Sequence, residues 1–136
     1  MSVIHLTAKD ASYHRYQDKE VFLGDVLDDS KSTTMSAGYY INPKKGVNNE
    51  WIVAYDEVLV VTRGALTIRF EGGSKTAQQG EIIFIAKGTK VAYEAGEDDT
   101  QAVYVSYPHW LKAQQGSEHA HYLERVKPAP EFSPQD

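Results

Sequence analysis

The twenty residues from Trp51 to Phe70, WIVAYDEVLVVTRGALTIRF, carry most of the information about the fold. They are rich in β-branched and aromatic residues, as a buried strand is, and the part from Ala65 to Phe70 alternates as a half-buried strand does. Two carboxylates, Asp56 and Glu57, interrupt the apolar run. They predict one strand bent near Asp56, with Asp56 facing solvent or capping the bend and Glu57 facing the interior.

Short strand-like segments separated by turns continue on both sides of this stretch. They are Glu20 to Leu27, Ser32 to Ile41, Ile82 to Ala86, Val91 to Glu94 and Ala102 to Tyr107. Turn pairs such as Gly72-Gly73 lie between them, and no helix of three turns is expected before residue 108. Many short strands at close intervals favour an all-β sandwich or barrel.

The chain has 136 residues, which is enough for a single domain with its own core. We expect an N-terminal extension over residues 1–31, a barrel core over 32–108 and a C-terminal segment over 109–136. That last segment can hold a turn or two of helix broken at Gly116, and three prolines after Lys127 predict an extended or flexible tail.

Composition excludes several classes of partner and chemistry. The net charge of −5 leaves no basic face for nucleic acid, and the apolar runs are too short to span a membrane. There is no cysteine for disulfides or thiolate catalysis. The first twelve residues lack the layout of a secretion signal, so the expected compartment is the cytoplasm.

The spacing of Glu57 and the glycines resembles the cupin family. The first cupin motif ends in Glu, six residues and Gly, which Glu57 and Gly64 match, and Gly80 and Gly88 match the turns of the second motif. The resemblance implies a double-stranded β-helix, the jelly-roll barrel of the cupins, as a single all-β domain.

Metal-binding cupins hold an ion with two histidines and the glutamate of the first motif and a histidine of the second. At the three histidine positions this sequence has Trp51, Val53 and Val91. A single carboxylate does not hold a transition metal against water. We therefore expect no metal at the usual cupin site, and no cofactor.

One branch of the cupins is more similar than the others. The stretch quoted above, with GEIIFIAKGTKV and AVYVSYP, resembles the EutQ-like cupins of ethanolamine utilization, which carry W-x-x-x-Y-D-E in place of His-x-His. This resemblance implies a small barrel with a polar, metal-free interior, usually as a homodimer. An N-terminal strand is expected to pair across the dimer, because edge strands need covering.

The candidate site is a carboxylate inside an aromatic wall. Strand alternation places Tyr55 and Glu57 on one face, and Tyr93 is expected to share that interior. Burial should raise the pKa of Glu57, which suits a general acid or base near neutral pH, with Tyr55 and Tyr93 assisting. The predicted ligand-binding residues are Trp51, Tyr40 and Tyr104.

Two functional classes remain open, and a third is weaker. The first is a metal-independent enzyme acting on a small polar or carboxylated metabolite. The second is a non-catalytic small-molecule-binding or accessory cupin, in which Glu57 hydrogen-bonds a tyrosine in the core. The third is metal catalysis with non-standard ligands such as His109, His119 or His121, of which the last two are expected to form an exposed pair.

Overall fold

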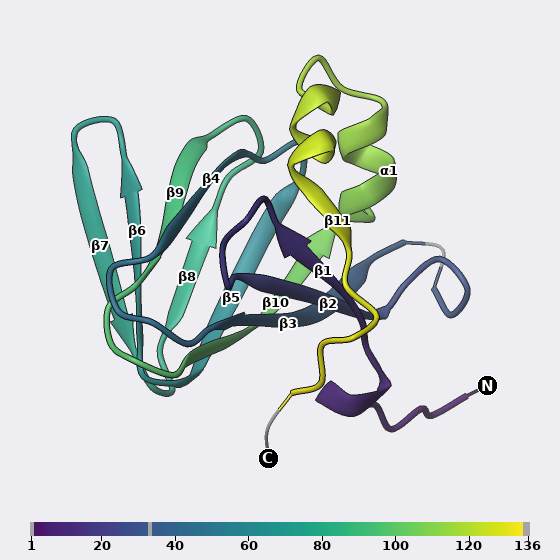
Figure 1. Ribbon diagram of the computed structural model, residues 1–136. Helices are drawn as coiled ribbons and strands as arrows, with labels where there is room; N and C mark the ends of the chain where they lie inside the picture. Colours follow the sequence, from purple (N-terminus) through teal and green to yellow (C-terminus); the bar gives the residue numbers. More distant parts are fainter. Residues whose placement is uncertain (1, 33, 135–136) are drawn as a thin grey trace.

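The computed structural model describes residues 2–32 and 34–134, and its strands form two antiparallel sheets (Figure 1). The larger sheet contains, in spatial order, β11 (Val126–Pro128), β1 (Ser12–Tyr16), β2 (Phe22–Leu27), β3 (Ser36–Asn42), β10 (Thr100–Tyr107), β5 (Asp56–Arg63) and β8 (Ile82–Ile85). The smaller sheet contains β4 (Asn48–Ile52), β9 (Lys90–Ala95), β6 (Ala65–Phe70) and β7 (Gly73–Gln78). The predicted all-β class is confirmed.

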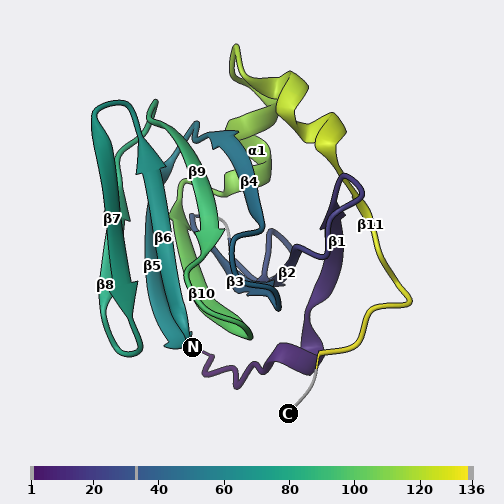
Figure 2. The same cartoon turned by 60° about the vertical axis from the view of Figure 1, so that its left-hand side comes forward.

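The two sheets face each other and enclose the main hydrophobic core (Figure 2). Alternation along the strands produces this arrangement. In β10, for example, Ala102 and Tyr104 are buried, whereas Val103 and Val105 between them are only half-buried. The core is therefore built from one face of each sheet, as in other β-sandwiches and barrels.

The stretch from Trp51 to Val61 is two strands rather than one bent strand. β4 ends at Ile52 in the smaller sheet, and β5 begins at Asp56 in the larger sheet. Between them the backbone of Val53 pairs with the turn before β9, accepting from the N–H of Gly88 and donating to the carbonyl of Thr89. These contacts direct the chain across the core instead of along one sheet.

The segment after β10 is more ordered than the sequence predicted. The expected short helix is α1 (Trp110–Gln115), which ends at Gly116 and is followed by the 3₁₀ helix η2 (Ala120–Arg125). A flexible tail was predicted after Lys127, but the first part of this segment packs against the rest of the protein. Ala129 is buried, and the ring of Phe132 stacks on Phe22 with 3.8 Å between ring centroids.

The N-terminal region is part of the larger sheet. After the 3₁₀ helix η1 (Ala8–Asp10), β1 pairs with β2 on one side and with β11 on the other, so both of its edges are covered within the chain. The first strand of this sheet along the chain is β1, which starts at Ser12. The two strands at the edges of the sheet are β11 and β8. Across the described residues, no helix is long and apolar enough to cross a membrane.

Candidate functional site

The Asp-Glu pair that interrupts the apolar run lies at the start of β5. Asp56 is exposed and accepts a hydrogen bond from the backbone N–H of Lys87 at 2.9 Å, so it caps the neighbouring turn. Glu57 points the other way and is 6% exposed. The predicted orientation of both carboxylates is confirmed.

The buried carboxylate of Glu57 is tied to the opposite sheet. Tyr93, on β9, donates a hydrogen bond from its hydroxyl group to Oε1 of Glu57 at 2.6 Å. Burial raises the pKa of Glu57 to about 7, although the Tyr93 hydrogen bond opposes this rise. The carboxyl group can therefore be protonated or ionised close to neutral pH.

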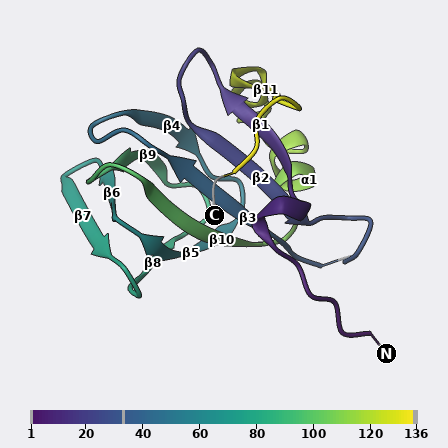
Figure 3. The ribbon, with the colours of Figure 1, turned by 60° about the horizontal axis from the view of Figure 1, so that its bottom comes forward.

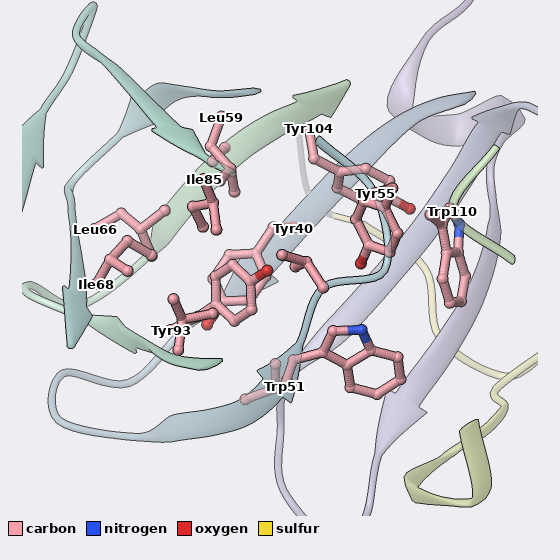
Figure 4. Packing of buried hydrophobic residues seen from close by; sticks show 14 of the residues in the cluster. Tyr40, Trp51, Tyr55, Leu59, Leu66, Ile68, Ile85, Tyr93, Tyr104 and Trp110 are labelled. Atoms are coloured by element: carbon pink, nitrogen blue, oxygen red, sulfur yellow. The ribbon is translucent and has the colours of Figure 1, made fainter. Parts of the chain in front are cut away.

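A cavity of about 40 Å³ lies beside Glu57 between the sheets. Its lining residues are Leu23, Tyr40, Asn49, Trp51, Tyr55, Glu57, Leu59, Tyr93, Tyr104 and Trp110. All six site residues expected from the sequence are among them, and Figure 4 shows the five aromatic ones converging from strands of both sheets and from the connection between β4 and β5. The volume admits about three water molecules, so any ligand it holds must be small. Among the residues that the structure describes, no Lys, Arg or His side chain lines the cavity.

The tyrosines of the wall differ in their hydrogen bonding. The hydroxyl of Tyr40 donates to Oδ1 of Asn49 at 3.0 Å and accepts from Asn42 at 3.1 Å, which fixes its ring 5.9 Å from that of Tyr93. Tyr55 lines the same cavity, but the hydrogen bond to the Glu57 carboxyl comes from Tyr93. Burial holds the pKa of Tyr55 and of Tyr93 well above the ordinary value, so both hydroxyls stay protonated.

A second carboxylate, Asp25 on β2, was missed in the sequence. Its Oδ1 accepts hydrogen bonds from the hydroxyl of Tyr104 and from Nε1 of Trp110, the latter at 2.8 Å. Burial raises the pKa of Asp25, and these two hydrogen bonds oppose the rise. The signal was present, because FLGDVL places a carboxylate inside a short apolar strand, two residues after the cavity-lining Leu23.

Helix α1 closes one end of the cavity and contributes two more residues that the sequence did not indicate. Trp110 packs edge-on against Trp51, with 6.2 Å between ring centroids. Gln114 is fully buried and accepts from Nε1 of Trp51 at 3.3 Å and from the backbone N–H of Ala54 at 3.3 Å. It also donates to the carbonyl of Ile52 at 3.0 Å. Gln114 thus fixes both the Trp51 ring and the crossover from β4 to β5.

The histidines do not form a cluster. His109 is buried and its Nε2 lies 2.6 Å from the carbonyl oxygen of Ser32, and His119 lies 3.4 Å from the carboxylate of Glu118. His121 is exposed on η2, and His119 is only half-buried. Within residues 2–32 and 34–134, no three His, Cys, Asp or Glu residues are arranged to hold a metal ion.

The position at which a cupin holds its metal does not suit one in this chain. Trp51, Val53 and Val91 are buried there, and they offer indole and aliphatic groups in place of imidazole nitrogens. Glu57 alone remains as a donor. The residues present do not fit a transition-metal site, which needs several nitrogen or oxygen ligands.

Comparison with known proteins identifies the family. Residues 7–112 match the family described as ethanolamine utilisation protein EutQ. The chain belongs to the EutQ family. It is 32% identical over 88 residues to acetate kinase EutQ of Clostridioides difficile (strain 630), a match covering 65% of this chain and 54% of that protein. The chain therefore spans about half the length of this relative.

Solved structures support the same assignment. The Clostridium difficile EutQ protein has a TM-score of 0.61 and 26% identity, with 77% of this chain and 81% of that chain covered. Ectoine synthase from P. lautus has a TM-score of 0.65 and 20% identity, with 100% and 94% covered, and shows likeness of fold alone. These neighbours confirm the predicted cupin-like fold of this EutQ-family chain.

Proposed function

We propose that this EutQ-family chain binds a small polar or carboxylated metabolite in the cavity and exchanges a proton with it through Glu57. The observation that carries the proposal is a buried carboxyl group that lines the cavity between the sheets and has a pKa of about 7. A group with this pKa is partly protonated at neutral pH, so it can act as an acid or as a base. Tyr93 orients the carboxyl through its hydrogen bond, and Tyr55 forms part of the wall.

The lining limits how a carboxylated ligand can bind. Because the described part of the chain places no cationic side chain in the cavity wall, a carboxylate has no ion-pair partner there and needs hydrogen-bond donors. Protonated Glu57 is such a donor, so a carboxylate should bind more tightly as the pH falls below 7. Acetate is a small carboxylate, and the curated relative in C. difficile bears the name acetate kinase.

The second candidate is a binding or accessory protein without turnover. The hydrogen bond between Glu57 and Tyr93 favours it, since a carboxyl that bridges two sheets also stabilises the barrel. The two candidates differ in what ionisation of Glu57 does. An acid–base group must exchange its proton with the ligand, whereas a structural group needs only to keep its hydrogen bond.

Glu57→Gln distinguishes the candidates, because glutamine keeps an oxygen that accepts from Tyr93 and cannot exchange a proton. We would titrate acetate by calorimetry between pH 5.5 and 8.5 and assay phosphorylation of acetate by ATP in parallel. Asp56→Asn is the matched control, since Asp56 is adjacent but faces solvent. The proposal expects E57Q to remove turnover and the pH dependence of binding, while D56N changes neither.

Each other outcome is informative. If E57Q retains turnover, Glu57 is not the acid–base group and the enzymatic proposal is wrong. If wild type binds acetate with the expected pH dependence and shows no turnover, the binding candidate is favoured. If acetate binds more tightly as the pH rises, the cavity does not bind carboxylates through protonated Glu57.

A further inference from the structure

The wall of the cavity beside Glu57 consists mostly of aromatic rings. They come from both sheets, from the connection between β4 and β5, and from α1. The aromatic lining residues are Tyr40, Trp51, Tyr55, Tyr93, Tyr104 and Trp110. The ring centroids of Trp51 and Trp110 are 6.2 Å apart, and those of Tyr40 and Tyr93 are 5.9 Å apart. The π face of such a ring is negative and attracts a cation, most strongly where water is excluded.

Two carboxylates accept hydrogen bonds from these rings. Tyr93 donates to Glu57 at 2.6 Å, and Nε1 of Trp110 donates to Asp25 at 2.8 Å. The hydroxyl of Tyr104 also donates to Asp25. A hydrogen bond to an ionised acceptor polarises its donor, so ionisation of either carboxylate makes the attached rings richer in electrons. The wall then attracts a cation more strongly than the rings would alone.

The contact between Tyr104 and Asp25 depends on a glycine. The strands β2, β3 and β10 lie side by side (Figure 3), and the register places Gly38 of β3 opposite Asp25 on one side and Tyr104 on the other. A Cβ at Gly38 would collide with the hydroxyl of Tyr104 and with the carbonyl oxygen of Gly24. The space left by Gly38 therefore lets the Tyr104 hydroxyl reach across β3 to Asp25.

The charges around the two carboxylates leave room for a cation. Within residues 2–32 and 34–134, no Lys, Arg or His side chain lines the cavity, and burial raises the pKa of both Glu57 and Asp25. The titratable groups that interact electrostatically with either carboxylate are Tyr55, Tyr93, Tyr104, His14 and Asp28. Burial holds the pKa of the three tyrosines well above the ordinary value, so they stay neutral. Inside the cavity, ionised Glu57 has hydrogen-bond donors but no partner of opposite charge.

We propose that the cavity binds a small organic ammonium ion, held by the ionised carboxylate of Glu57 and by the aromatic rings around it. This rests on the proposed function, since the cavity must be a ligand site, and it names a second class of ligand. An ammonium group supplies the positive charge and the hydrogen-bond donors that pair with a buried carboxylate. The net charge of −5 also draws cations toward the protein. A carboxylate ligand needs protonated Glu57, whereas an ammonium ligand needs the ionised form.

Methylammonium chloride is the probe, because the cavity requires a small ligand. Tryptophan fluorescence reports its binding, since both tryptophans of the chain, Trp51 and Trp110, line the cavity. The probe stays cationic below about pH 9, as a lysine side chain does. Its affinity should rise about 10-fold between pH 6 and 8, following the ionised fraction of Glu57. Sodium chloride and methanol, at the same concentrations, should leave the fluorescence unchanged.

Substitutions assign the binding to the two carboxylates. Glu57→Gln removes the charge and should weaken methylammonium binding at pH 8 at least about 10-fold, with no remaining dependence on pH. Asp25→Asn keeps an acceptor oxygen and should weaken binding by about 3-fold, because Asp25 acts through the rings of Tyr104 and Trp110. Asp56→Asn is the matched control, since it removes an exposed charge next to Glu57, and it should leave the affinity unchanged.

Proton NMR of the wild type gives a second measurement that needs no variant to fold. The methyl resonance of bound methylammonium should move upfield, because aromatic rings surround it. An affinity that does not rise with pH, that is the same in wild type, E57Q and D25N, or that comes without an upfield shift overturns the proposal. Acetate binding below pH 7 would then leave the proposed function standing. If neither acetate nor methylammonium binds, the proposed function is wrong as well.

Discussion

Replacing Glu57 by glutamine should change how the stability of the protein depends on pH. The native carboxyl has a pKa of about 7, compared with an ordinary value of 4.5, because burial favours its neutral form. The native state therefore binds a proton more tightly than the unfolded chain does. The resulting stabilisation is complete below pH 4.5 and is lost as the pH rises through 7.

The pKa difference sets the magnitude. The pKa rises from 4.5 in the unfolded chain to about 7 in the native state, and each pKa unit corresponds to about 1.4 kcal/mol. Protonation of Glu57 therefore contributes about 3 kcal/mol to the free energy of unfolding at low pH, and ionisation removes this contribution. Glutamine at position 57 has nearly the same shape, accepts the hydrogen bond of Tyr93 and does not titrate. The E57Q protein should therefore lose less stability than wild type between pH 4.5 and 7, by about 3 kcal/mol.

Urea unfolding of both proteins at intervals between pH 4.5 and 8.5 measures this difference. Subtracting the two curves cancels the other titrating groups, including Asp25, whose pKa is raised in the same direction. The difference should develop between pH 4.5 and 7 and be constant above about pH 8. Parallel curves over the whole range would refute the reasoning, because they would mean that the environment of Glu57 does not favour its protonated form.

Three further substitutions test the surrounding contacts. Tyr93→Phe removes the hydrogen bond that lowers the pKa of Glu57, so the pH dependence of unfolding should move to a midpoint above 7, as measured with urea at several pH values. Asp25→Ala leaves two buried donors without their acceptor and should cost about 2–4 kcal/mol, whereas Asp25→Asn keeps an acceptor oxygen and should cost about 1 kcal/mol, both from urea midpoints. Phe132→Ala removes the ring stacked on Phe22 and should lower the unfolding free energy by about 1–2 kcal/mol, which a thermal melt detects.

Local patterns predicted most strands because local physics determines them. The alternation in AVYVSY gives β10, and ALTIRF forms β6 as expected, although Ala65 to Ile68 are all buried rather than alternating. The Gly72-Gly73 pair gives the hairpin between β6 and β7, where Gly72 has a φ of 97°. Glycine adopts this left-handed conformation without the steric cost that a side chain adds. These elements depend on a few adjacent residues, so the sequence is sufficient to locate them.

Features that depend on distant contacts were missed. β11 has three residues, and it is a strand only because β1 offers an unpaired edge more than a hundred residues earlier in the chain. Phe132 lies in a proline-rich segment, and the sequence does not show that its ring meets Phe22. The split between β4 and β5 is likewise set by the backbone pairing of Val53 with the turn before β9.

The site shows the same division between local and distant information. The glycine spacing that the chain shares with the cupins indicated Glu57, but no such spacing points to Asp25, although each is a carboxylate within a short apolar strand. Each also accepts a hydrogen bond from a tyrosine hydroxyl, and burial raises the pKa of both. As the pH rises, ionisation of both groups makes the cavity and its surroundings anionic. A carboxylate ligand that binds to protonated Glu57 should then be released as the pH rises through about 7.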